Sequence, residues 1–118
     1  RDEFASDEEI AAVLADMTSL TVIEVVWTKR YLRELSEIAD YLAERNPGAA
    51  ARIVRDIHSK TKTLLSSNPF IGRPGEIDDT RELVLPASGY IVAYRVRDER
   101  VEVLFVQHGA KEWPRDVS

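Results

Sequence analysis

Cationic and titratable side chains collect in the C-terminal half of the sequence, where they could hold a phosphate group and move a proton. They are Arg73, Arg81, Arg95, His108 and Lys111. Cleavage of RNA through its 2′-hydroxyl needs such groups, because a base takes the proton, cations hold the phosphate as charge builds, and an acid protonates the leaving oxygen. A simpler role for Arg81 and Arg95 is pairing with acids on a sheet, such as Glu82 or Glu102. The residue types alone leave both roles open.

Several other chemistries lack the residues that they need. The sequence has no cysteine, which excludes a disulfide framework, a cysteine zinc site and a thiol nucleophile. Its two histidines, His58 and His108, show neither a His-x-His nor an HExxH spacing, so we expect no metal and no cofactor. Gly72 and Gly75 precede no expected helix, which removes a phosphate loop, and Ser88 lacks the glycine pattern of a nucleophile elbow. We assign His58 no role, and His108 at a strand end fits a structural hydrogen bond better than catalysis.

The charge of the 118-residue chain is divided unevenly. Residues 1–16 carry one arginine and six acids, which accounts for the whole net charge of −5, whereas residues 17–118 carry 15 basic and 15 acidic groups. Such asymmetry is typical of an interaction segment. The single methionine, Met17, follows this segment, and we interpret it as an initiator that separates the domain from an upstream acidic segment. No apolar run approaches the roughly 18 residues of a membrane span, so we expect a cytoplasmic protein with no membrane partner.

The acidic segment contains the pattern of a short amphipathic helix. Ser6 can act as its N-cap, and Glu9 three residues later completes a capping box. The neighbouring acids suit the positive end of the helix dipole. A helix of this length is marginal alone, so its apolar stripe needs a surface to cover it. The stripe consists of Ile10, Val13 and Leu14, and Phe4 stands just before the cap, so that the apolar residues of the segment are four.

The next part of the chain predicts one strand and two helices. A β-branched run predicts a strand over residues 21–27, and Thr28 can cap the helix that follows. Apolar residues at helical spacing predict two helices that meet at Asn46 and Pro47, where Pro47 suits the first turn of the second helix. So short a link makes the two helices antiparallel neighbours.

The C-terminal part predicts a long irregular stretch and then strands. Residues 68–79 contain two prolines and two glycines, and long loops of this kind are often functional. Three apolar segments follow, at residues 80–85, 89–97 and 100–107, and the last two meet at a connection of hairpin length. Alternation in the last segment predicts two faces, Val101, Val103, Phe105 and Gln107 against Glu102, Leu104, Val106 and His108. The expected fold is α+β with the order βααβββ: an antiparallel sheet covered by an αα-hairpin, with an extra short N-terminal amphipathic helix.

Two stretches of this region carry a family resemblance. The sequence RELVLPASGYIVAYRV, residues 81–96, and the sequence VEVLFVQHGAKEWP, residues 101–114, resemble the C-terminal half of RelE/ParE superfamily toxins. The Asn46-Pro47 pair and the sequence NPFIGRPG of residues 68–75 match as well, so that the resemblance covers about residues 20–115. It implies a toxin of a type II toxin–antitoxin module with the βααβββ order.

The superfamily contains two activities, and the sequence favours one of them. RelE-like members cut messenger RNA on the ribosome, and the resemblance places Arg81 and Arg95 where those enzymes hold phosphate. Such ribonucleases are strongly basic, because phosphate neutralisation dominates RNA binding, whereas residues 17–118 are formally neutral. Trp113 stands near where RelE has a tyrosine, and an indole cannot transfer a proton. We therefore expect a ParE-like inhibitor of DNA gyrase that catalyses nothing. Target-binding residues in this interpretation are Arg73, Arg81, Arg95, His108, Lys111 and Trp113.

The acidic segment resembles part of a partner protein. Residues 4–15 resemble the toxin-neutralising C-terminal stretch of an antitoxin, which predicts a division into residues 1–16 and a toxin domain of residues 17–118. Its four apolar residues are the expected contacts with the toxin. The expected partners are a cognate antitoxin and DNA gyrase, with a homodimer or a toxin–antitoxin hetero-oligomer as possible assemblies. Two alternatives stay open: a ribosome-dependent endoribonuclease acting on mRNA, and an inactive interaction domain.

Overall fold

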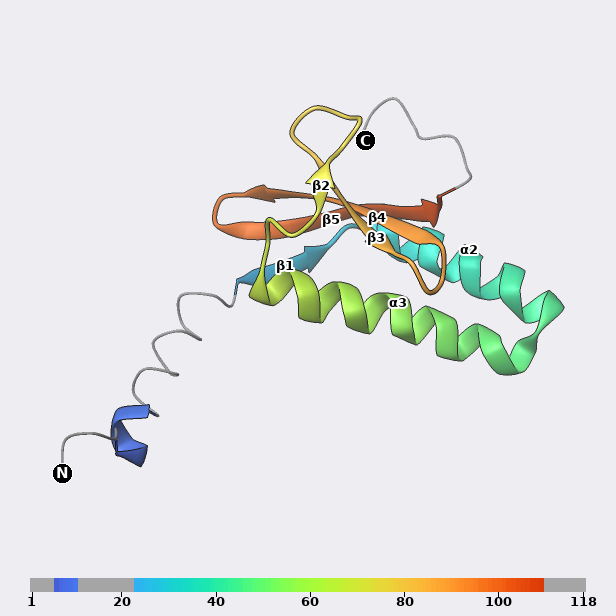
Figure 1. The fold of residues 1–118 in the computed structure, drawn as a ribbon. Coiled ribbons are helices and arrows are strands. Elements are labelled where there is room, and N and C mark those ends of the chain that lie inside the picture. The colour runs from blue at the N-terminus through green and yellow to red at the C-terminus, as the bar shows by residue number, and fades with distance from the viewer. Residues whose placement is uncertain (1–5, 11–22, 110–118) are drawn as a thin grey trace.

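The computed structural model describes residues 6–10 and 23–109, in which two helices lie on one side of a sheet (Figure 1). The elements follow the expected order, and their bounds agree with the sequence pattern to within three residues in the described part. They are β1 (Glu24–Trp27), α2 (Lys29–Arg45), α3 (Pro47–Ser67), β2 (Arg73–Pro74), β3 (Arg81–Leu85), β4 (Tyr90–Arg97) and β5 (Arg100–His108).

The sheet has the strand order β1-β5-β4-β3-β2 and is mostly antiparallel. The expected fold class is confirmed with two additions. The first strand, β1, runs parallel to β5, which its long connection through both helices allows. A two-residue strand, β2, lies inside the stretch expected to be irregular and pairs with the start of β3. Across the intervening loop, the amide of Gly75 donates to the carbonyl of Thr80 at 2.8 Å.

Side-chain caps fix the two helices, as the sequence predicts. The hydroxyl of Thr28 accepts a hydrogen bond from the amide of Tyr31 at 3.1 Å and so caps α2. Asn46 ends α2 and begins α3, because its amide donates to Leu42 while its side chain accepts from the amide of Ala49 at 3.2 Å. Pro47 occupies the first turn of α3. The link between the helices is therefore a single shared cap.

The main core lies between the helices and one face of the sheet, called here the helix-facing side. The largest fully buried side chains there are Tyr31, Tyr94, Ile57 and Leu65, which suits a close-packed interior. The core members are Tyr31, Leu35, Ile57, Leu65, Leu83, Leu85, Tyr90, Val92, Tyr94, Val101, Val103 and Val106.

A β-bulge at Leu104 makes the predicted alternation of β5 wrong. Val103 pairs with Tyr94 and Phe105 pairs with Ala93, so Leu104 is the extra residue of the strand. Phe105 consequently leaves the face of Val103 and packs with Ala93 and Leu104 in a second cluster. The same shift carries His108 onto the helix-facing side, where it pairs with Tyr90. The bulge thus decides which face of the sheet receives the histidine.

Beyond β1, the edge of β5 is covered by the start of α2. The hydroxyl of Thr28 donates to the carbonyl of Leu104 at 2.8 Å. A carboxylate oxygen of Glu34 accepts from the amide of Val106 at 3.0 Å. These contacts satisfy backbone groups that a longer β1 would have paired. Among the described residues, no helix is long and apolar enough to cross a membrane.

Candidate functional site

Arg81 lies at the start of β3 and is bound to the loop before it. Its guanidinium donates to the carbonyl of Gly72 at 2.8 Å and to that of Phe70 at 3.3 Å. The same group lies 5.2 Å from the centroid of the Phe70 ring, a cation–π distance. A small hollow of about 250 Å³ opens beside this contact. Arg81 therefore holds the backbone of the loop, and Phe70 is left 59% exposed.

Arg95 is paired with the strand beside it. Its Nε lies 2.6 Å from a carboxylate oxygen of Glu102, its cross-strand neighbour on β5. Arg100 approaches the second oxygen of Glu102 at 3.4 Å. The hydrogen bond from Arg95 is the main reason that the pKa of Glu102 lies below its ordinary value. The pairing of Arg95 with Glu102 is one of the simple structural roles that the sequence suggests.

The two arginines project from opposite faces of the sheet. Arg81 is the cross-strand neighbour of Tyr94, so these two side chains share the helix-facing side. Arg95 follows Tyr94 in β4, and successive residues of a strand point to opposite faces. The structure therefore does not bring Arg81 and Arg95 together on one phosphate.

Arg73 pairs with the buried carboxylate of Glu82, the acid that the sequence offers as a partner for Arg81. Two nitrogens of Arg73 lie 2.9 Å from one oxygen of Glu82, whose side chain is 5% exposed. The other oxygen accepts from the amide of Glu76 at 3.2 Å. Both oxygens of Glu82 thus tie the loop of residues 73–80 to the sheet, while 57% of the Arg73 side chain stays exposed.

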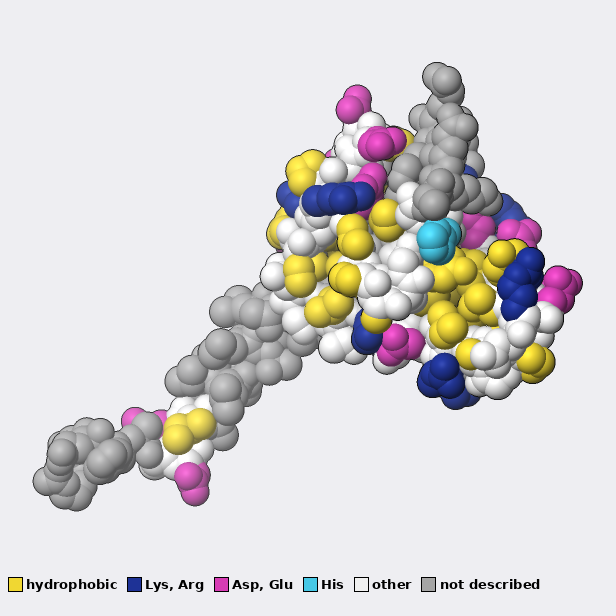
Figure 2. Space-filling model, turned by 45° about the vertical axis from the view of Figure 1, so that its right-hand side comes forward, with side chains coloured by type: hydrophobic (Ala, Val, Ile, Leu, Met, Phe, Trp, Pro, Cys, Tyr) yellow, Lys and Arg dark blue, Asp and Glu magenta, His cyan; other side chains and the backbone are white. Residues whose placement is uncertain are grey.

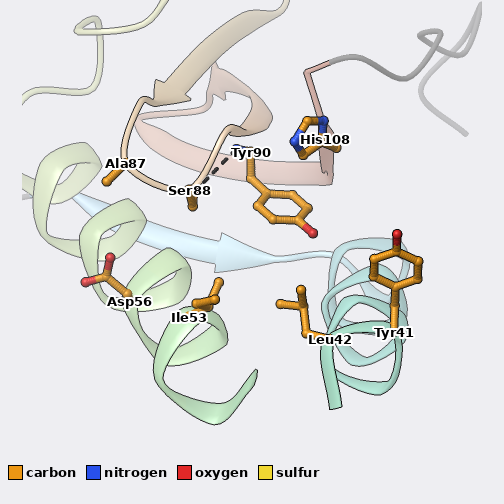
Figure 3. A pocket seen from close by; sticks show the side chains of 8 residues that line it. All are labelled: Tyr41, Leu42, Ile53, Asp56, Ala87, Ser88, Tyr90 and His108. Atoms are coloured by element: carbon orange, nitrogen blue, oxygen red, sulfur yellow. Dashed lines mark hydrogen bonds between the residues drawn. The ribbon is translucent and has the colours of Figure 1, made fainter. Parts of the chain in front are cut away.

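His108 lies at the mouth of a groove between the helical hairpin and the end of the sheet. Its ring meets that of Tyr90 edge to face, with 5.3 Å between centroids. Two adjoining hollows, of about 390 and 620 Å³, form what we call the hairpin groove, and both are lined by Tyr41, Tyr90 and His108. In Figure 3, Leu42 and Ile53 point into the first hollow from the two helices, and Ser88 bounds it from the β3–β4 turn.

The lining of the hairpin groove is largely apolar with a charged border. Figure 2 shows hydrophobic side chains gathered in a hollow next to a histidine, with basic and acidic side chains around them. The second hollow adds apolar and acidic residues from α2, namely Glu34, Glu37 and Ile38, and Val106 and Gln107 from β5. Tyr41 is 53% exposed there, with Arg45 stacked 3.7 Å from its ring centroid. No pattern in the sequence marks Tyr41, because a single exposed aromatic residue on a helix is common.

The N-terminal segment is described only in part. Residues 7–10 form a helical turn, and the predicted capping box is confirmed: the Ser6 amide donates to Glu9 at 3.0 Å and the Glu9 amide to the Ser6 hydroxyl at 3.1 Å. The hydrogen bond from the Ser6 backbone is the main cause that lowers the pKa of Glu9. Ile10 of the expected apolar stripe is 47% exposed. The other expected residues lie outside the described part, namely Phe4, Val13, Leu14, Lys111 and Trp113.

An aromatic and histidine cluster that the sequence did not suggest lies at the start of α2. The hydroxyl of Tyr31 lies 3.0 Å from Nδ1 of His58, and the Trp27 ring is 4.2 Å from the His58 ring. Burial, followed by the charge of Lys62, lowers the pKa of His58. The cluster fixes β1 and α3 to the beginning of α2. Within residues 6–10 and 23–109, no three histidine, aspartate or glutamate side chains are grouped to hold a metal.

The arrangement of a five-stranded sheet, a helical hairpin and a groove between them is that of the RelE/ParE superfamily of toxins. The chain aligns over 74% of its length with a chain of the chromosomal ParDE toxin–antitoxin system from P. aeruginosa, covering 96% of that chain at 26% identity with a TM-score of 0.68. A chain of the RelBE2 toxin–antitoxin complex from Mycobacterium tuberculosis shares the fold, with a TM-score of 0.58 and 24% identity over 78% of this chain and 97% of that one.

Sequence comparison identifies the family within this superfamily. Residues 25–113 match the family model described as the ParE toxin of the type II toxin–antitoxin system parDE, and the chain belongs to this family. It is 45% identical over 89 residues to the putative toxin Y4kP of Sinorhizobium fredii, which covers 75% of this chain and 91% of that relative. It is 31% identical over 88 residues to toxin RelE2 of Caulobacter vibrioides, covering 75% and 97% respectively. The expected membership of the toxin superfamily is confirmed.

Proposed function

We propose that residues 17–118 form a ParE-like toxin domain that stops growth by binding DNA gyrase, without catalysis. The observation that carries this proposal is the placement of Arg81 and Arg95 on opposite faces of the sheet. An RNA-cleaving site needs its cations to converge on the phosphate as charge builds. Arg81 instead holds loop carbonyls, and Arg95 is paired with Glu102 at 2.6 Å. A gyrase target would put the protein in the cytoplasm.

The charge balance of the domain supports the same proposal. Residues 17–118 carry equal numbers of basic and acidic groups. Binding to ribosomal RNA depends on releasing counterions from many phosphates, which a neutral domain does poorly. A protein target does not impose this requirement, because protein interfaces rely on apolar anchors and a polar rim.

For neutralisation, we propose that an antitoxin-type helix occupies the hairpin groove. The groove offers apolar walls, such as Leu42 and Ile53, to a helix with one apolar stripe. The chain's own residues 1–16 have such a stripe, and burial of each large apolar side chain contributes roughly 1.5–3 kcal/mol. The solved relatives come from toxin–antitoxin systems, which supports an antitoxin as the partner.

The experiment is a supercoiling and cleavage assay with purified gyrase and residues 17–118. The matched segments make up 91% and 97% of the two relatives, so this domain is about the size of a whole relative. We expect gyrase–DNA cleavage complexes to accumulate and a peptide of residues 1–16 to relieve them. A folded, growth-arresting domain without effect on gyrase would refute the proposal.

The ribonuclease alternative has one observation in its favour, the 31% identity to a protein named toxin RelE2. Its test is primer extension on messenger RNA from cells that express residues 17–118. Cleavage at defined codons, abolished by Arg81→Ala and by Arg95→Ala separately, would establish it. Arg100→Ala is the matched control, because Arg100 contacts the same Glu102 as Arg95 and is outside the expected site. A folded domain that neither arrests growth nor acts on gyrase or messenger RNA would instead support the inactive interaction domain.

A further inference from the structure

The solvent-facing side of α3 carries an unbalanced row of basic side chains. Helix α3 contains four basic residues and one acid, Asp56. Arg52, Arg55 and Lys62 are exposed and lie at helical spacing opposite the buried side of the helix. Within the described ranges, none of the three forms an ion pair, whereas Lys60 pairs with Asp56 at 3.0 Å. The row, which we call the α3 basic row, extends for about 15 Å along the helix axis.

The chain enters its first strand beside the C-terminal end of this helix. The amide of Ile23 donates to the carbonyl of Ser66 at 3.0 Å, and Figure 1 shows the start of β1 next to the end of α3. Any segment upstream of Ile23 therefore begins its path at that end of α3. The upstream segment contains the acidic residues of the chain's N-terminus, five negative charges net within residues 1–16.

The chain upstream of Ile23 is long enough to reach from the C-terminal end of α3 to its N-terminal half. Ile23 lies thirteen positions after Ile10, a distance of about 20 Å along a helix and about 43 Å along an extended chain. The path from Ser66 back to Arg52 is about 21 Å along the helix axis. A segment attached at Ile23 can thus bring the acids at positions 7–9 to the N-terminal half of α3, close to Ile53 in the wall of the hairpin groove.

We propose that the acidic N-terminal segment docks in cis along α3, with its acids on the α3 basic row. Charge complementarity and the attachment point both select this occupant over a second molecule, because a tethered segment competes at a millimolar effective concentration. Docking runs antiparallel to α3 and places the acids of positions 7–9 beside Arg52 and Arg55. The inference deepens the neutralising role proposed above, but its test measures position and requires no toxin activity.

The test uses disulfide trapping in the full chain, which has no native cysteine. One variant combines Glu8→Cys with Ala51→Cys, since Ala51 is exposed on α3 next to Arg52, and this pair leaves the α3 basic row and the Ser6–Glu9 capping box intact. The control combines Glu8→Cys with Glu99→Cys. Glu99 is exposed and precedes Arg100, the partner of Glu24 at the start of β1, so it lies within the same reach but away from α3.

With oxidised glutathione as the oxidant, we expect the Ala51 pair to form an intramolecular disulfide about tenfold faster than the Glu99 pair. Arg52→Glu with Arg55→Glu should remove this difference, whereas Lys60→Glu should leave it. Salt should reduce it too, because the Debye length falls from about 8 Å to about 3 Å at 1 M. Equal rates for the two pairs, insensitivity to Arg52→Glu with Arg55→Glu, or a disulfide-linked dimer would overturn the inference. A negative gyrase assay would leave it standing.

Discussion

The hydroxyl of Tyr94 accepts a hydrogen bond from the amide of Gly72 at 2.8 Å, and this bond ties the loop after α3 to the centre of the sheet. Tyr94 is fully buried, and burial raises the pKa of its hydroxyl. A Cβ at position 72 would lie only 2.6 Å from that oxygen, so the close approach requires glycine. The loop that presents Phe70 is therefore held by a buried polar contact.

We expect Tyr94→Phe to lower the free energy of unfolding by about 1–3 kcal/mol, because the buried amide of Gly72 loses its acceptor. The midpoint of thermal unfolding should fall by roughly 4–8 °C for each kcal/mol in a domain of this size. The measurement is urea and thermal denaturation of the full chain. Tyr41→Phe is the control, since Tyr41 is half exposed and its loss of a hydroxyl should change stability little. Equal effects of the two variants would contradict the proposed role of Tyr94.

The ion pair of Arg95 and Glu102 predicts a pH dependence of stability. The pKa of Glu102 is lower in the folded state than its ordinary value of 4.5, so its contribution is complete above that value and is lost as pH falls through the folded pKa. We expect Glu102→Gln to destabilise the protein at pH 7 by about 1.5–3 kcal/mol, the range for hydrogen bonds to charged groups. The difference should shrink below pH 4.5, measured by denaturant unfolding at each pH. A difference that stays constant down to pH 3 would show that another group is responsible.

The lowered pKa of His58 predicts a second pH dependence of folding stability, at higher pH. Burial and Lys62 lower its folded pKa below the ordinary value of 6.5, so the unfolded chain takes up a proton first as pH falls. Stability should therefore be complete above 6.5 and decline as pH falls through that value toward the folded pKa. His58→Gln should flatten this slope between pH 7.5 and 5. An unchanged slope in His58→Gln would exclude His58 as its origin.

Local structure was readable from the sequence because it depends on near neighbours. Thr28, Asn46 and Pro47 mark the helix ends through contacts within four residues, and the structure confirms each of them. The turn at Asp98 and Glu99 has positive φ at both residues, as a two-residue hairpin connection requires. Such features need no knowledge of the rest of the fold.

The sequence did not predict in the same way on which face of the sheet each side chain lies. One inserted residue, Leu104, moves every later side chain of β5 to the other face, and no residue type marks the bulge. The placement of Arg81 opposite Tyr94 likewise depends on the β3–β4 register, which the turn sets. The hairpin groove combines helix positions with strand positions far apart in sequence, so spacing could not reveal it.

The apolar stripe of the N-terminal segment gives the prediction most directly tied to function. We expect Phe4→Ala with Ile10→Ala to restore toxicity to the full chain. The two substitutions remove large side chains from the proposed contact with the groove, and the burial of each contributes roughly 1.5–3 kcal/mol to binding. Growth after induced expression is the measurement, and the matched control is Ala11→Ser with Ala12→Ser, which leaves the stripe unchanged. Ile53→Asp tests the other side of the contact, since Ile53 lines the groove. If residues 17–118 alone arrest growth while the Phe4→Ala, Ile10→Ala chain stays harmless, apolar docking does not neutralise the domain, and the acids that face the α3 basic row become the segment's remaining means of holding it.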